Sequence, residues 1–159
     1  MATFSSNPVY LDDRQFDFAL SDDKRAFTIT FSDLQVKVDE GDSALSSAAF
    51  SLILPLEGST AGEKVEIEFA VTGAAVTNGG ATATMMLSIS GQSIVADFPT
   101  DVTQDLNQQA TFTAEHGATE CRFSTFLLVG RDSPNAAAFL NISAIDAEFL
   151  PRPAQPSSD

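Results

Sequence analysis

Apolar and polar residues alternate along most of the chain, in short segments separated by residues that favour turns. The clearest segment covers residues 65–71, where every odd position is apolar and Glu66 and Glu68 occupy two of the even positions. Segments 16–20 and 27–31 repeat the pattern. A period of two is typical of β-strands that bury one face, and no segment shows a helical period. The chain is therefore predicted to be all-β.

The alternation changes phase twice. Between Phe31 and Leu34 the apolar residues switch from odd to even positions, and a second switch separates Ile142 from Ile145. A shift of one residue indicates a bulge or a bend, and a bent strand can leave one sheet and enter another at the corner of a sandwich. With about nine strands at regular spacing, the shifts predict an antiparallel two-sheet β-sandwich. Its strand pattern resembles that of jelly-roll ligand-binding modules, without identifying a family.

Turn-forming and polar segments divide the chain further. Asn78-Gly79-Gly80 predicts a β-hairpin, because Asn-Gly and Gly-Gly suit the central positions of tight hairpin turns. Segment 99–109 is polar and is expected to be a long connection. Residues 1–150 are predicted to form a single domain, since their number is normal for one. Residues 151–159 are rich in Pro and Ser and are expected to form a flexible tail.

The charge balance narrows the possible partners. The formal net charge is -14, from 22 acidic and 8 basic residues. Such an acidic chain repels phosphate backbones and anionic membranes, so neither nucleic acid nor membrane insertion is expected. The first sixteen residues lack the basic and apolar regions of a secretory signal. With a single cysteine and therefore no intrachain disulfide, the cytoplasm is the favoured compartment of a soluble protein.

The acidic segment Asp39-Glu40-Gly41-Asp42 is the best candidate for a cation site. Hard cations such as calcium take several carboxylate or carbonyl oxygens from a loop. Asp39, Glu40 and Asp42 could supply them, which makes calcium the one cofactor to consider. The spacing is not that of an EF-hand. Solvated loop charge is the alternative, and it is the preferred interpretation.

His116 and Cys121 flank a predicted turn at Gly117. In a four-residue hairpin they would be cross-strand neighbours, with the carboxylates of Glu115 and Glu120 nearby. Such a set could bind zinc or another transition metal, and a Cys–His pair could act as nucleophile and base. However, no orienting third group or oxyanion hole is recognisable. A polar hairpin with an incidental thiol is the preferred interpretation, and the sequence leans away from an enzyme.

Sugar binding is a natural function for a jelly roll, although a fold does not imply a function. Sugar sites commonly stack a pyranose ring on Trp or Tyr, and this chain has 13 Phe, one Tyr and no Trp. Tyr10, Arg131 and Asp132 are the candidate ligand-binding residues. Most of the Phe residues fall at core positions and are expected to pack inside.

Two hypotheses of function follow. The leading one is a non-catalytic β-sandwich that works through protein contacts, as a structural, assembly or adaptor component. It includes a protein partner and a homo-oligomer, with the acidic face of Glu66 and Glu68 as a contact surface. The alternative is a carbohydrate- or small-ligand-binding module, in one version assisted by calcium.

Overall fold

The computed structural model describes residues 1–10, 15–39 and 44–151 of the chain. These residues form twelve β-strands, where about nine were expected; the two-residue strands at the N-terminus are too short to give an alternation. The described residues include no helix that could cross a membrane. The strands are β1 (Thr3–Phe4), β2 (Val9–Tyr10), β3 (Phe16–Leu20), β4 (Ala26–Phe31), β5 (Gln35–Val38), β6 (Leu45–Glu57), β7 (Val65–Asn78), β8 (Thr82–Ile89), β9 (Gln92–Phe98), β10 (Val102–Ala114), β11 (Glu120–Gly130) and β12 (Ala137–Leu150).

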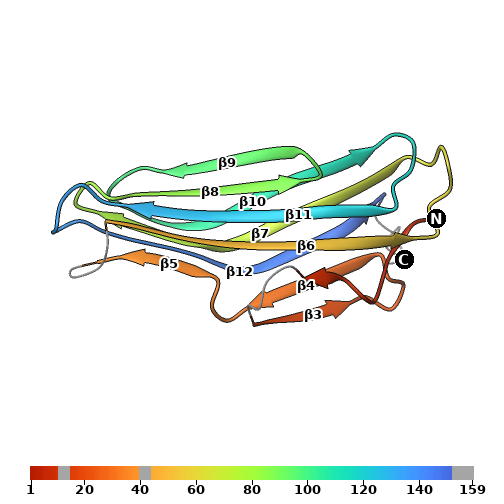
Figure 1. The fold of residues 1–159 in the computed structure, drawn as a ribbon, viewed down its shortest axis with the longest axis horizontal. Coiled ribbons are helices and arrows are strands. Elements are labelled where there is room, and N and C mark those ends of the chain that lie inside the picture. The colour runs from red at the N-terminus through yellow and green to blue at the C-terminus, as the bar shows by residue number, and fades with distance from the viewer. Residues whose placement is uncertain (11–14, 40–43, 152–159) are drawn as a thin grey trace, which may run out of the picture.

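The strands form two antiparallel sheets packed face to face, which confirms the predicted all-β sandwich. The first, called here the β11 sheet, has the order β1-β6-β11-β8-β9, and β2 also pairs with β6. The second, called the β12 sheet, has the order β10-β7-β12-β4-β3, and β5 also pairs with β12. The long strands of both sheets run along the long axis of the molecule (Figure 1). Each sheet therefore has one face toward the core and one face toward solvent.

Both phase changes in the sequence come from one irregularity in the β12 sheet. β4 pairs with residues 144–148 of β12, and β5 pairs with residues 138–141. Between these two pairings the register of β12 against β7 shifts, which leaves Ser143 as the extra residue of a β-bulge. β4 and β5 thus stay in one sheet on either side of the bulge. The expectation that the chain passes to the other sheet near Asp33 is wrong.

Gly73 of β7 lies opposite this bulge. It pairs with Ile142, and a Cβ at Gly73 would overlap the carbonyl oxygen of Asn141 and lie 2.9 Å from its carbonyl carbon. The Asn141 side chain also links β12 to β7 here, because its Oδ1 accepts a hydrogen bond from the Ala74 amide at 2.8 Å. The two backbones approach too closely for any side chain, so glycine is required here.

Two connections differ from the prediction. The polar segment 99–109 is not a long connection, because most of it belongs to β10, an edge strand that pairs with β7 along its whole length. Asn78-Gly79-Gly80 does form a turn with positive φ at both glycines. However, this turn joins β7 of one sheet to β8 of the other and closes no hairpin. A two-residue hairpin is formed instead by Ser90-Gly91, between β8 and β9.

The core lies between the two sheets and is rich in phenylalanine. Phe69 of β7 stacks on Phe123 of β11 with ring centroids 5.5 Å apart, and both residues are buried. Phe31 of β4 meets Phe50 of β6 edge to face at 4.7 Å. Aromatic pairs of these geometries add about 0.5–1.5 kcal/mol beyond the area that they bury. The predicted role of most Phe residues in packing is therefore confirmed.

Candidate functional site

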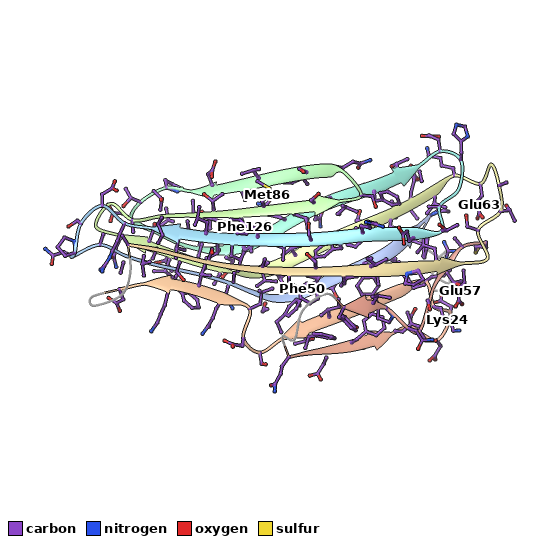
Figure 2. All side chains as sticks on the ribbon, in the orientation of Figure 1. Lys24, Phe50, Glu57, Glu63, Met86 and Phe126 are labelled. Carbon is purple, nitrogen blue, oxygen red and sulfur yellow. The ribbon has the colours of Figure 1, made fainter. Side chains whose placement is uncertain are left out.

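An apolar row crosses the solvent face of the β11 sheet. Phe126 of β11 lies opposite Ala49 of β6 and Met86 of β8. Met86 in turn lies opposite Val95 of the edge strand β9. Phe126, Met86 and Val95 keep 41%, 42% and 52% of their surface exposed, and Figure 2 shows Phe126 and Met86 side by side in the middle of the sheet. Since neighbouring strands lie about 4.8 Å apart, this row from β6 to β9 is roughly 14 Å long.

A shallow hollow of about 330 Å³ lies beside the apolar row. Its centre is a second row, in which Ser124 of β11 pairs with Ser51 of β6 and Ser88 of β8. Arg122 and Ile53, which pair across β11 and β6, line the far side. Small serine side chains between larger ones produce the depression. We call this feature the serine hollow.

The serine hydroxyls of the hollow are not engaged with the protein. Ser51, Ser88 and Ser124 are half-buried. Within the part of the chain that the structure describes, their side chains make no hydrogen bond. A hydroxyl group offers one donor and two acceptor lone pairs. The hollow therefore presents a line of free donors and acceptors next to an apolar strip.

Charges near the hollow are paired or bonded. The Arg122 Nε donates to Oε1 of Glu120 at 3.0 Å, in a solvent-exposed ion pair. Farther along, Thr84 Oγ1 donates to Oδ1 of Asp97 at 2.8 Å. The apolar row and the serine row contain no ionisable side chain. This strip of surface is thus uncharged in a chain whose formal net charge is -14.

Tyr10 lies outside the serine hollow. It pairs with Leu52 through the short strand β2, and its ring centroid is 4.0 Å from that of Phe16 and 6.5 Å from that of Phe50. Partial burial raises the pKa of Tyr10 through desolvation. The ring therefore fastens β2 to the body of the sandwich, and a role in ligand binding stays a prediction.

Arg131 and Asp132 lie beyond the end of β11, at the opposite end of that strand from Arg122. The Arg131 Nη1 donates to the carbonyl oxygens of Pro134 and Ala136 at 3.1 and 3.4 Å. Arg131 thereby fastens the turn before β12, while Asp132 is exposed on the same turn. The structure does not bring these two residues to the serine hollow, and their role in ligand binding also stays a prediction.

His116 and Cys121 are not neighbours on a hairpin, so that prediction is wrong. β10 belongs to the β12 sheet and the next strand to the β11 sheet, which means that the segment between them crosses from one sheet to the other. His116 is exposed there, whereas Cys121 is completely buried. Burial raises the pKa of the Cys121 thiol to about 12, against the opposing effect of a hydrogen bond with Ser90. The thiolate is the form that binds metals and acts as a nucleophile, and this buried position disfavours it.

The acidic segment proposed for calcium is described only at its first residue. Asp39 is exposed after the end of β5, and Glu40 and Asp42 lie outside the described residues. Elsewhere, across residues 1–10, 15–39 and 44–151, no group of three or more His, Cys, Asp or Glu side chains is placed to hold a metal ion. A calcium site at Asp39, Glu40 and Asp42 stays a prediction.

Phe126 is the functional candidate that the sequence pattern did not single out. A continuous apolar run such as residues 126–129 is the pattern of a strand that is buried on both faces. In the structure Leu127 and Val129 face the core, and Phe126 points the other way. Its position was a usable signal, because Phe126 has the opposite parity to Phe123 and shares the parity of Ser124.

Comparison of the sequence with models of protein families and with curated proteins gives no match. Among solved structures, TmCBM61 in complex with β-1,4-galactotriose is 11% identical, with a TM-score of 0.33 over 93% of this chain and 90% of that one. The CBM36-1 domain of a multidomain xylanase from the hindgut metagenome of Trinervitermes trinervoides is 14% identical, with a TM-score of 0.32 over 94% and 98%. A carbohydrate-binding module CBM36 in complex with calcium and xylotriose is 16% identical, with a TM-score of 0.28 over 90% and 98%.

These comparisons contradict the leading hypothesis drawn from the sequence. The matched structures named above are carbohydrate-binding modules. The expected protein partner and homo-oligomer were part of that hypothesis and are not retained. At such low identities and TM-scores the likeness assigns no ligand to this chain, so its ligand has to be argued from its own residues.

Proposed function

We propose that this chain is a carbohydrate-binding module, and that it binds sugar at the apolar row and the adjacent serine hollow. One observation carries the proposal. The exposed ring of Phe126 lies next to serine hydroxyls that have no partner within the described part of the chain. An exposed apolar strip of this kind marks a binding surface, and the serines specify what kind of ligand suits it.

The two rows match the two chemical sides of a sugar ring. A pyranose ring has C–H groups on its faces and hydroxyl groups around its edge. The flat side of Phe126 suits the first, and Ser88 and Ser124 can donate to and accept from the second. Phenylalanine lacks the polar tip of Tyr or Trp, but here the neighbouring serines supply the hydrogen bonds. The shortage of Trp and Tyr therefore does not argue against sugar binding at this face.

The size and charge of the hollow indicate a short, neutral ligand segment. Its volume of about 330 Å³ is near the lower end of the range of about 300–1,000 Å³ that is usual for ligand pockets. The apolar and serine rows are uncharged, Arg122 at the far side of the hollow is paired with Glu120, and the net charge of -14 repels anionic polymers at long range. A neutral oligosaccharide fits these conditions better than an acidic one.

The proposed binding mode does not use calcium. No described group of carboxylates fits a metal ion, and the serine hollow has no free carboxylate. Calcium binding at Asp39, Glu40 and Asp42 would lie on a different part of the chain and is kept as a separate expectation.

Affinity electrophoresis tests the proposal, with soluble xylan, galactan, mannan and mixed-linkage β-glucan in the gel. We expect at least one neutral polysaccharide to retard the wild-type chain. The Phe126→Ala variant should bind that polysaccharide at least about tenfold more weakly, because each 1.4 kcal/mol of lost contact is a factor of ten. Replacing Ser124 with valine should also weaken binding, since it removes a hydroxyl without changing the apolar row.

Leu45→Ala is the matched control. Leu45 is also an exposed apolar residue on the solvent face of β6, with 65% of its surface exposed, and it lies outside the apolar row. Its removal should leave the retardation unchanged. Retardation as strong in Phe126→Ala and in Ser124→Val as in wild type, or no binding to any of the polymers, would overturn the proposal.

A further inference from the structure

A second hollow lies on the opposite solvent face of the sandwich. Its volume is about 250 Å³, and it is formed where β5, β7 and β12 run side by side. Phe139 of β12 lies at its centre, paired with Val76 of β7 on one side and Lys37 of β5 on the other. Asn78 and Asp39 also line the hollow, at the strand ends. We call this feature the Phe139 hollow.

The Phe139 hollow is built on the same plan as the first site. Phe139 and Val76 form a partly exposed apolar pair. The next row toward the bulge consists of Asn141 of β12 with Gln35 of β5. Gln35 lies beside the hollow and not in its lining, and its exposed side chain presents two donors and an acceptor. An apolar ring beside a polar row again suits a sugar ring.

The distribution of charge on this sheet favours an uncharged ligand at the Phe139 hollow. Toward the other end of the sheet, Glu68 lies directly opposite Glu148, and Asp146 follows on the same face. At the hollow, Lys37 and Asp39 balance one another in sign. Within the described residues, Lys37 makes no ion pair and keeps its donors for a ligand. The hollow is therefore a charge-balanced area on a face that is otherwise acidic.

We propose that the Phe139 hollow is a second carbohydrate site, so that one chain holds two glycan segments at once. This inference rests on the proposed function for the chemistry of the ligand, but on separate residues for the site. Phe69 and Phe123 stack between the sheets, which means that Phe126 and Phe139 point out of opposite faces of the sandwich. Two ligands therefore cannot compete for space. A monomer of this kind would cross-link polysaccharide chains, with the gain in avidity that two linked sites give.

Titration calorimetry of the wild-type chain tests the second site. The titrant is a short oligosaccharide of whichever neutral polymer binds in the electrophoresis. We expect two oligosaccharides bound per chain, and one in each of the variants Phe126→Ala and Phe139→Ala. Because Phe139 is half-buried, Lys37→Ala provides a second variant of the same hollow that leaves the packing intact. Urea melts of each variant show whether it is folded.

Cross-linking gives an independent measurement. Mixed with the long polymer, the wild-type chain should form a turbid suspension, and either single variant should bind without turbidity. Gln109→Ala, an exposed change on the same sheet outside the hollow, should behave as wild type. A stoichiometry of one that is lost in Phe126→Ala and unchanged in Phe139→Ala and Lys37→Ala would overturn the second site while leaving the proposed function in place. No binding of any sugar would overturn both.

Discussion

The close approach of two backbones at Gly73 makes a sharp test of the fold. In a Gly73→Ala variant the new Cβ would overlap the Asn141 carbonyl oxygen, which is a backbone atom and cannot rotate away. β7 and β12 would have to separate locally at the bulge. The matched variant is Gly130→Ala, because Gly130 also lies in a strand and also has no positive φ. There the nearest atom is the end of the flexible Leu45 side chain, at 2.9 Å.

The two variants should differ in their free energy of unfolding, because overpacking affects only one of them. Overpacking costs about 1–3 kcal/mol, and a weakened ladder hydrogen bond costs about 0.5–1.5 kcal/mol. Against this, replacing glycine with alanine lowers the entropy of the unfolded chain and returns about 0.4–1 kcal/mol. Gly73→Ala should therefore lower the free energy of unfolding by about 2–3 kcal/mol. Gly130→Ala has only the small side-chain rearrangement to offset the gain, and should stay within about 0.5 kcal/mol of wild type.

Urea melts followed by circular dichroism measure this difference, and thermal melts check it. For a chain of this length 1 kcal/mol corresponds to about 2–4 °C in Tm, so Gly73→Ala should melt roughly 4–12 °C below wild type. Equal stabilities of the two variants, or a Gly73→Ala variant as stable as wild type, would show that β7 and β12 do not approach as described. The bulge assignment would then be wrong as well.

Two further predictions concern the core and the metal. Phe69→Ala should lower the free energy of unfolding by about 3–5 kcal/mol, because it leaves a cavity beside Phe123, whereas Phe126→Ala should change it by less than about 0.5 kcal/mol; similar losses in urea melts would mean that the two faces of β11 are misassigned. EDTA should leave the Tm unchanged, since no described group fits a metal ion; a large drop that calcium alone restores would establish a site at Asp39, Glu40 and Asp42.

The fold class could be predicted because the alternation records which face of each strand is buried. The first half of β7 shows this well, because from Val65 to Val71 the odd positions are buried and the even ones half-buried. The polar edge strand β10 could not be found in this way. Only Leu106 and Phe112 of that strand are buried, so its sequence has the composition of a loop. What makes it a strand is the ladder that it shares with β7, which no local pattern records.

The phase changes illustrate the same limit. They correctly indicated an irregularity, but a bulge within one sheet and a corner between two sheets give the same shift in parity. Pairing decides between them, and here β4 and β5 both pair with β12. The turns behave likewise. Asn78-Gly79-Gly80 has the residues of a hairpin turn, but the partner of the next strand lies in the other sheet.

The candidate site was hidden because it depends on residues that meet across three strands. Ser51, Ser88 and Ser124 are unremarkable in sequence, and they form a row only through the register of β6, β11 and β8. The sequence pattern instead pointed to single polar residues that lie close together in the chain. His116 and Cys121 lie close in sequence, but their side chains differ completely in exposure because the chain changes sheets between them.

Because Cys121 is buried, the rate at which its thiol is labelled measures how often the sandwich opens around β11. The thiolate is the form that reacts with alkylating reagents, and with a pKa of about 12 the native thiol supplies almost none at neutral pH. Labelling must then wait until β11 is exposed. The Cys121 side chain lies in the core between the two sheets, so its exposure requires the sandwich to open there. With an excess of reagent, the labelling rate therefore equals the rate at which the native structure opens, and no engineered probe is needed.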